Sequence, residues 1–256
     1  MFVRVLFAVF CLKLFLGGAN GDPCSPLTTT LQYESSSYSC DAGDSKALLS
    51  VVANRGSVQK PLVSLTSVID LSGSMAGRKM TLLRETNLYL IEKLAESGVD
   101  HKFGVVTFSE NAEEPIQLDT LTPSAAAAAK EEIKKVSQSG YTDLWAGLEK
   151  GIRQQTADSK TDKYIRAVFL FTDGKPNRGV HDTNQIIKNA KKLVKDASDD
   201  GHTILIYTFS VGDRVDVNLL AGIANAGGGL MYSVRTAVDV PKAFGSAVAG
   251  NCCNLH

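Results

Sequence analysis

The stretch LVSLTSVIDLSGS, residues 62–74, decides the fold of this chain. Its first part, residues 62–70, is apolar or β-branched at most positions, as expected of a strand that is covered on both faces. Asp70, Ser72 and Ser74 follow on a short turn that contains a glycine. Ligands bind at the carboxyl ends of the strands in open α/β sheets. The stretch therefore indicates a buried parallel strand with a candidate binding site at its end.

Apolar runs of this kind alternate with segments of helical period from about residue 60 onward. Strands are expected at 62–70, 102–109, 164–173 and 203–212, with shorter ones at 115–118 and 230–234. Helices are expected at 78–97, 123–137, 143–155, 183–199, 215–226 and 237–249, with Thr142 as the N-cap of the third. This order predicts an α/β fold in which a Rossmann-like, doubly wound, mostly parallel sheet is flanked by helices.

Residues 27–60 follow a different pattern from the rest of the chain. The segments LTTTLQYES and KALLSVVANR read as two strands on either side of a polar stretch. We expect them to form an N-terminal antiparallel β elaboration that adds to the main sheet. The predicted organisation is an extension at 22–60, a main domain at 61–250 and a short cysteine-containing tail at 251–256.

Residues 1–21 have the layout of a secretory signal peptide. Arg4 precedes an apolar run that ends in small residues, and cleavage after Ala19 or Gly21 fits this pattern. A membrane anchor is the alternative, but Lys13 interrupts the run, which is shorter than the ~20 residues that a span requires. We therefore expect a secreted, extracellular protein.

Cysteine usage agrees with secretion. Cys11 lies inside the expected signal peptide. The remaining cysteines are Cys24, Cys40, Cys252 and Cys253, an even set that suits an oxidising compartment. A bond between the neighbours Cys252 and Cys253 would be strained, so pairings that join the two ends of the chain are favoured. A Cys24–Cys40 bond within the N-terminal extension remains the alternative.

The charges of the chain are balanced, with 27 Lys and Arg residues against 27 Asp and Glu residues. Loss of Arg4 and Lys13 with the signal peptide leaves 25 basic residues, so the mature chain stays close to neutral. No overall field favours nucleic acid or an anionic membrane surface as the partner. Recognition must therefore depend on a local site.

Two further segments add polar side chains to the same expected edge of the sheet. The segment GYTDL at 140–144 opens an expected helix and contains Thr142. The segment FLFTDG at 169–174 ends an expected strand with Asp173, which a glycine follows. Both segments and the turn after residue 70 are expected at the carboxyl edge of the sheet, so their side chains can act together.

At these positions the chain resembles the von Willebrand factor A (VWA) family. The metal-ion-dependent adhesion site (MIDAS) of that family is built from an Asp-x-Ser-x-Ser turn, a distant Thr and a distant Asp. The matching residues are Asp70, Ser72, Ser74, Thr142 and Asp173. The resemblance covers about residues 60–250, and it implies a VWA fold with a complete metal site.

The resemblance also implies a division of roles within this site. The usual direct ligands correspond to the hydroxyls of Ser72, Ser74 and Thr142. Asp70 and Asp173 would act through water or hold the hydroxyls in place, and an open coordination position would accept an Asp or Glu carboxylate of an extracellular protein partner. Oxygen ligands in a small octahedral shell favour Mg²⁺, with Mn²⁺ or Ca²⁺ as alternatives. The expected function is therefore metal-dependent protein binding and cell adhesion.

Other functions fit these residues less well. Each residue of the set could by itself be a helix cap or a turn former, but their joint occurrence in three loops favours metal binding. A hydrolase is disfavoured because residues 73–77 lack the first glycine of Gly-x-Ser-x-Gly and no histidine is expected near Ser74, so we expect no enzymatic activity. An extracellular matrix protein that uses the metal only for stability remains the alternative. Residues 175–178 follow Asp173 and could line the rim of the site, but a solvated loop is the favoured role.

Overall fold

The computed structural model describes residues 29–32, 48–51, 61–158, 163–212 and 215–236. The expected signal peptide, the five cysteines and the helix expected at 237–249 lie outside these residues. The chain divides into two compact units, of which one is Pro61–Val248 and the other comprises Met1–Lys60 with Ala249–His256. Each unit is described by itself.

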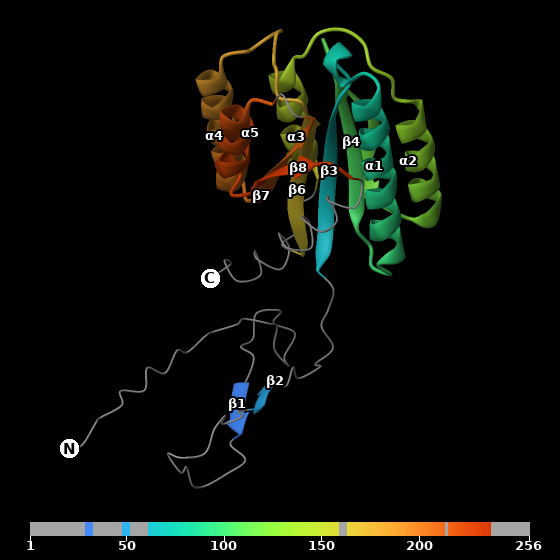
Figure 1. The fold of residues 1–256 in the computed structure, drawn as a ribbon, viewed down its shortest axis with the longest axis vertical. Coiled ribbons are helices and arrows are strands. Elements are labelled where there is room, and N and C mark those ends of the chain that lie inside the picture. The colour runs from blue at the N-terminus through green and yellow to red at the C-terminus, as the bar shows by residue number, and fades with distance from the viewer. Residues whose placement is uncertain (1–28, 33–47, 52–60, 159–162, 213–214, 237–256) are drawn as a thin grey trace, which may run out of the picture. The chain divides into compact units, whose positions relative to one another are not determined.

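Within the described residues, the larger unit is built on a six-stranded sheet with the order β5-β4-β3-β6-β7-β8 (Figure 1). The strands are β3 Leu62–Asp70, β4 Lys102–Phe108, β5 Ala112–Thr120, β6 Tyr164–Thr172, β7 Ile204–Val211 and β8 Met231–Val234. Neighbouring strands run parallel except for β5, which pairs antiparallel with β4. The predicted Rossmann-like, mostly parallel sheet is confirmed.

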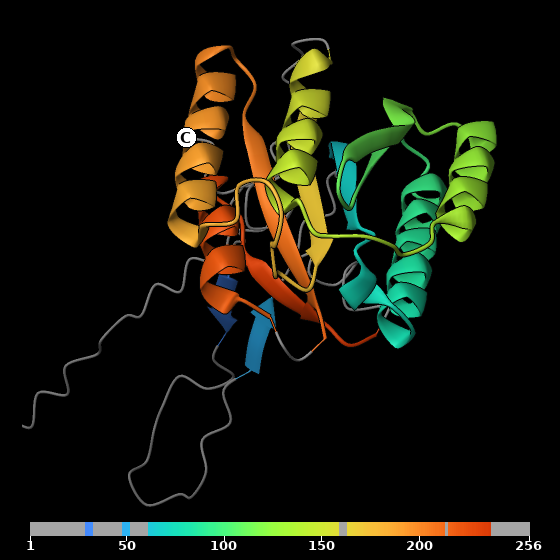
Figure 2. The same ribbon diagram turned by 90° about the horizontal axis from the view of Figure 1, so that it is seen from above.

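Helices cover both faces of this sheet, as Figures 1 and 2 show. They are α1 Arg78–Glu96, α2 Pro123–Lys135, α3 Leu144–Ala157, α4 Thr183–Asp199 and α5 Val217–Ala226, and a short 3-10 turn, η1, spans Gly73–Met75. Helices α1 and α2 lie on one face, and α3, α4 and α5 lie on the other. Each face carries its own apolar core, which explains why the central strands are apolar almost throughout.

The edge strand β5 is longer than the sequence predicted, because only its central residues 115–118 were expected to be extended. Its side chains alternate between partly buried and exposed positions along its whole length. Pro115 lies within it, as is common on edge strands that face solvent on one side. Because polar residues alternate with apolar ones along an edge strand, a prediction that relies on continuous apolar runs misses the ends of the strand.

Short polar side chains cap helices α2 to α5, whereas α1 begins after Gly77 without a side-chain cap. Asp143 is the N-cap of α3, and its side chain accepts a hydrogen bond from the Ala146 backbone N–H at 3.0 Å. The prediction that Thr142 caps this helix is therefore wrong by one residue. The Asp143 carboxylate satisfies one of the free N–H groups of the first turn, which leaves the Thr142 side chain available for other contacts.

The smaller unit contains two described strands, β1 Thr29–Gln32 and β2 Leu48–Val51. They pair antiparallel with each other, with Thr29 opposite Val51, in a two-stranded sheet of their own. The two strands expected at 27–60 are thus present, but the expectation that they extend the main sheet is wrong. Four-residue strands that are close in sequence satisfy one another's backbone groups by pairing locally.

The direction of the chain reverses across the sheet between β3 and β6. The chain continues from β3 through α1 to β4 on one side, whereas β6 lies on the other side of β3. In doubly wound sheets the crevice at such a switch point, outside the carboxyl ends of the strands, is where ligands bind. Asp70 ends β3 and Asp173 directly follows β6, so the fold places these two carboxylates at the carboxyl ends of the two strands that flank the switch point.

None of the helices in the described part of the chain combines the length and the apolar character that crossing a membrane requires.

Candidate metal centre

Asp70 is fully buried at the end of β3, and both of its carboxylate oxygens accept hydrogen bonds. Oδ1 accepts the Ser72 backbone N–H at 2.8 Å, and Oδ2 accepts the Thr172 hydroxyl at 2.6 Å. Thr172 is itself held because its hydroxyl accepts the Gly174 backbone N–H at 2.9 Å. This chain of contacts ties the end of β3 to the end of β6 and fixes the Asp70 side chain in one orientation.

The turn after Asp70 brings two hydroxyls together. Ser72 Oγ and Ser74 Oγ lie 3.1 Å apart, with Ser72 buried and Ser74 exposed. Within the same turn, the Gly73 backbone N–H donates to the Gly140 carbonyl at 3.1 Å. The backbone therefore attaches the serine turn to the loop that leads into α3.

Thr142 lies in that second loop, and its side chain is 2% exposed. Its backbone N–H donates to Asn177 Oδ1 at 2.8 Å, and its carbonyl accepts the Asn177 backbone N–H at 3.1 Å. Asn177 belongs to the loop that follows β6. The loop after β3, the loop before α3 and the loop after β6 are thus joined in series at the carboxyl edge of the sheet.

Asp173 begins the third loop, and it is 2% exposed. Its Oδ2 atom accepts a hydrogen bond from the Lys79 ammonium at 2.8 Å. Its Oδ1 atom is buried, and no hydrogen-bond partner for it is found in the described part of the chain. A buried carboxylate oxygen without a partner is energetically costly, so its retention needs an explanation.

Burial dominates the electrostatics of Asp70. It raises the pKa of this carboxyl from 3.8 to about 6, and the negative charge of Asp173 acts in the same direction. The hydrogen bonds from Thr172 and Ser72 lower the pKa and offset part of this effect. A cation close to both carboxylates would reverse the effect of burial, because it stabilises their charged forms.

The donor set fits a small, hard cation. Within the described ranges, no group of three or more His, Cys, Asp or Glu side chains is placed to hold a metal, so an ion here would depend on hydroxyl oxygens. Two carboxylates and the serine hydroxyls supply oxygen atoms of the kind that Mg²⁺ and Ca²⁺ prefer. The unpartnered Asp173 Oδ1 is the feature that such an ion would satisfy.

Sequence reasoning missed two residues that shape this region, Thr172 and Lys79, and it gave Asn177 no definite contact. Thr172 and Lys79 hold the two carboxylates, and Asn177 holds the Thr142 backbone. Asn177 is exposed, as expected of a solvated loop, and its side chain also accepts a hydrogen bond from the Thr142 backbone in the loop before α3. No local pattern in the sequence points to these contacts, whose partners lie between 35 and 102 residues apart along the chain.

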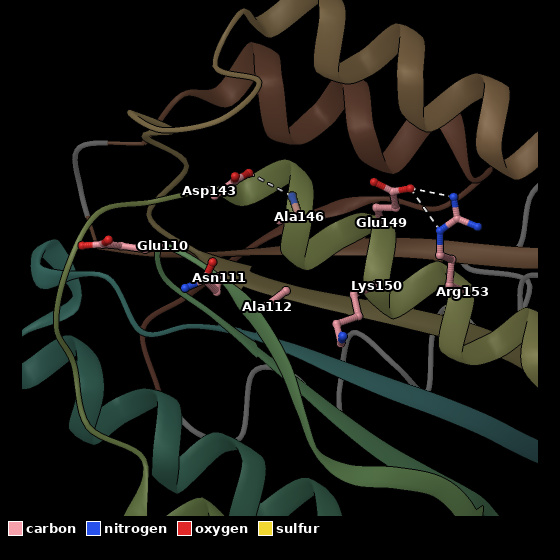
Figure 3. A pocket seen from close by; sticks show the side chains of 8 residues that line it. All are labelled: Glu110, Asn111, Ala112, Asp143, Ala146, Glu149, Lys150 and Arg153. Atoms are coloured by element: carbon pink, nitrogen blue, oxygen red, sulfur yellow. Dashed lines mark hydrogen bonds and ion pairs between the residues drawn. The ribbon is translucent and has the colours of Figure 1, made fainter.

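A shallow pocket lies beside these loops, at the start of α3, and Figure 3 shows it. It is lined by Glu110, Asn111, Ala112, Asp143, Ala146, Glu149, Lys150 and Arg153. Arg178 forms an ion pair with Glu110 of this pocket at 3.3 Å, and its guanidinium lies 5.7 Å from the Tyr141 ring centre. Tyr141 is 55% exposed, so the surface around Thr142 offers an aromatic ring and charges of both signs.

The fold and these loops define an α/β domain with a candidate binding edge at the carboxyl ends of β3 and β6. Residues 65–245 match the von Willebrand factor type A domain family, and the chain belongs to this family. Domains of the family typically serve in protein interaction and adhesion.

Relatives of known sequence include proteins from distant organisms. An uncharacterized protein of Synechocystis sp. is 32% identical over 171 residues, which cover 66% of this chain and 37% of that protein. The bovine (Bos taurus) inter-alpha-trypsin inhibitor heavy chain H1 is 29% identical over 158 residues, which cover 60% of this chain and 16% of the heavy chain. The chain therefore matches well under half the length of these relatives.

Solved structures show the same fold. A von Willebrand factor type A protein from Catenulispora acidiphila superposes with a TM-score of 0.59 at 22% identity, covering 75% of this chain and 43% of that chain. Proximal thread matrix protein 1 from the mussel byssus, described with zinc in its MIDAS motif, superposes with a TM-score of 0.55 at 19% identity. That superposition covers 75% of this chain and 46% of the mussel chain.

Proposed function

We propose that this chain is a secreted protein-binding domain that engages an acidic group of its partner through a divalent cation. The cation would be held by Asp70, Ser72, Ser74, Thr142 and Asp173. The observation that carries the proposal is the buried Asp173 Oδ1 atom, which lacks a hydrogen-bond partner in the described residues and belongs to the residue that directly follows β6, the strand next to β3. The zinc in the MIDAS motif of the mussel protein supports a metal at the equivalent place.

The five residues would have two different roles at the metal. Ser72, Ser74 and Thr142 would contact the ion through their hydroxyls, while Asp70 and Asp173 would hold the hydroxyls or act through water. Neutral hydroxyl ligands leave the ion more positive than carboxylate ligands would, and a bound ion of this kind attracts an anionic ligand at an open position. Mg²⁺ suits a small oxygen shell best, and Mn²⁺ or Ca²⁺ could replace it.

The exposed surface beside the site would select among acidic partners. Tyr141 and Arg178 stand next to Thr142, and both residue types often dominate the energetics of protein interfaces. A carboxylate alone does not distinguish one partner from another. We therefore place specificity in the Tyr141 and Arg178 side chains and in the charged pocket beside α3.

Water-proton relaxation with Mn²⁺ as the probe tests the open coordination position directly. Bound Mn²⁺ that keeps exchangeable water should enhance relaxation, and acetate should lower the enhancement by displacing that water. The proposal requires both effects in the wild type and neither in Asp173→Ala. Enhancement that acetate leaves unchanged would contradict partner binding through the metal and would leave the metal with a stabilising role.

A matrix protein that uses the metal only for stability is the second candidate, because one structural relative is a thread matrix protein. The two functions differ in what a chelator does to partner binding. Proteins captured from native extracellular material should be lost with chelator and with Asp173→Ala if the metal bridges the partner. Capture that survives both changes, together with a lower melting temperature, would favour the matrix function.

Catalysis is not proposed for this site. The hydroxyl of Ser74 pairs with that of Ser72, and no hydrogen bond joins it to a histidine within the residues that the structure describes. A serine nucleophile needs a base within hydrogen-bond reach. Assays of turnover with Mg²⁺ on simple esters and phosphates should show no activity above that of Asp173→Ala.

Secretion and disulfide formation belong to the same proposal. Removal of residues 1–21 would leave four cysteines in a chain that is exported to an oxidising compartment. Alkylation of the secreted protein without prior reduction should then label no thiol, and mass spectrometry of its peptides would give the pairing. Free thiols in the secreted protein would contradict this part of the proposal.

A further inference from the structure

Lys79 lies in the first turn of α1, and it bridges two of the loops that form the candidate metal centre. Its ammonium donates to Asp173 Oδ2 at 2.8 Å and to the Ser74 backbone carbonyl at 3.1 Å. The lysine side chain is 30% exposed, whereas its carboxylate partner is 2% exposed. An ammonium group therefore already occupies one side of the carboxylate that a metal ion would need.

The backbone is shaped to admit this side chain. Gly212 follows β7 with a φ of +102°, and a Cβ atom added there would lie 2.7 Å from Lys79 Cε. The lysine stem thus passes over bare backbone at the end of a neighbouring strand. Helix α1, the serine turn, the loop after β6 and Gly212 together fix the position of the ammonium.

The position of Lys79 is unfavourable for the helix that carries it. The first turn of α1 contains no acidic residue and begins with Arg78 and Lys79. Positive side chains are destabilising at a helix N-terminus, where the helix dipole is itself positive. Helix formation does not explain a lysine here, whereas its contact with a buried carboxylate does.

We propose, building on the metal site put forward above, that Lys79 is an internal counter-cation that weakens metal binding and strengthens carboxylate binding. In the metal-free protein it neutralises Asp173. In the metal-bound protein it keeps Oδ2 occupied, so that only Oδ1 faces the ion. Lys79 acts through Asp173 and is therefore a positioning residue rather than a metal ligand.

Charge balance explains both halves of this proposal. The ionised Asp70 and Asp173 carry two negative charges, and the ammonium removes one of them. Without an ion the site then carries one net negative charge instead of two, so it attracts a cation less strongly, and with a divalent ion it carries one net positive charge, which attracts an anion. Metal and carboxylate would consequently bind with positive coupling, each raising the affinity of the site for the other.

The first part of the proposal, that Lys79 weakens metal binding, is tested by titrating Lys79→Met with Mn²⁺ at pH 8. Electron paramagnetic resonance detects the free and the bound ion. Loss of one positive charge close to the ion should tighten Mn²⁺ binding at least about tenfold. Lys79→Arg keeps the charge and should bind Mn²⁺ within about threefold of the wild type, since the Coulomb term is retained. Lys93→Met, at the other end of α1 in an exposed pair with Glu96, is the matched control and should leave Mn²⁺ affinity unchanged.

The same samples test the second part of the proposal, that Lys79 strengthens carboxylate binding. Acetate should displace water from bound Mn²⁺ at higher concentrations in Lys79→Met than in the wild type. A purely structural role for the lysine predicts the opposite metal result, because a disordered site would bind Mn²⁺ more weakly. Thermal melting in chelator would show whether Lys79→Met folds. If it does not, Lys79→Gln, which also removes the positive charge, replaces it in both measurements.

The outcomes separate this inference from the proposed function. A wild type that binds no Mn²⁺ overturns the metal site itself. A wild type that binds Mn²⁺, with equal or weaker binding in Lys79→Met, overturns the counter-cation and leaves the metal site standing. Tight binding in Lys79→Arg as well as in Lys79→Met would show that charge is not the cause.

Discussion

Asp70 shows how a single buried group can link the state of this site to pH. Its side chain is enclosed between the serine turn and Thr172, and burial raises its pKa to about 6 in the metal-free protein. The unfolded chain titrates this carboxyl near the ordinary value of 3.8. Between these two values the folded state binds more protons than the unfolded state does.

The free energy of unfolding of the metal-free protein should therefore fall as pH rises from about 4 to about 6, by up to about 3 kcal/mol from this group. Below this window both states are protonated, and the contribution is fully present. Urea unfolding in chelator at a series of pH values would measure it. Asp70→Asn cannot titrate, so its curve should lack this fall, and equal pH dependence in the two proteins would contradict the assignment.

Substitution of Tyr141 should change the affinity for the partner without changing the affinity for the metal. Its ring is exposed, and its hydroxyl is not among the proposed metal ligands. Tyr141→Ala should lower partner affinity by at least about 1 kcal/mol, as is common for aromatic residues at interfaces, with Mn²⁺ affinity unchanged. Surface plasmon resonance with a partner recovered from extracellular material would measure the first effect. A parallel loss of Mn²⁺ binding would show that the ring supports the loop instead.

The sequence was informative about the five residues of the expected site, because each lies at a recognisable strand or helix boundary. It was uninformative about Lys79 and Thr172, whose partners Asp173 and Asp70 are 94 and 102 residues away along the chain. Contacts of this kind depend on which strands are neighbours in the sheet. Strand order cannot be read from local periodicity, so these two residues emerged only with the structure.

At the level of elements, α3 places Thr142 by packing closely against the sheet. A Cβ atom added at Gly147 would lie 2.4 Å from Phe108 Cδ1, and one added at Gly151 would lie 2.4 Å from Val68 Cγ2. The two glycines are one helical turn apart, so they form a flat strip that lets the helix approach β3 and β4. The start of α3 is thereby fixed next to the loops after β3 and β6.

Gly147→Ala should destabilise the protein by about 1–3 kcal/mol, because the added methyl group forces the helix away from the buried Phe108 ring. Urea unfolding would measure the loss. Arg153→Ala, on the exposed side of the same helix, is the matched control and should change stability by less than about 0.5 kcal/mol. A Gly147→Ala variant as stable as the control would contradict the close packing described here.

Helices and strands with a clear hydrophobic period were predicted well. Features that depend on which strands pair with each other were not. The central strands and the amphipathic helices matched their expected ranges within a few residues. The ends of β5 were missed because an edge strand mixes polar and apolar residues. The separate pairing of β1 with β2 was missed because the sequence does not show which strand forms hydrogen bonds with which.

At the scale of the whole molecule, a metal that binds only the folded chain must raise its stability. Mg²⁺ at about 100 times its dissociation constant should add about 2.7 kcal/mol to the free energy of unfolding of the wild type. Thermal melting with and without Mg²⁺ would show this as a shift that disappears in chelator. Asp173→Ala should show no shift, and an equal shift in that variant would place the ion elsewhere.

The central claim is that one divalent ion binds where β3, α3 and β6 bring their loops together. Isothermal titration of the metal-free protein with Mn²⁺, in the wild type and in Asp173→Ala, tests it most directly. The account predicts a single site per chain in the wild type and loss of that site in the variant, with the fold of both confirmed by circular dichroism. An absence of binding in the wild type, or binding that survives Asp173→Ala, would contradict it.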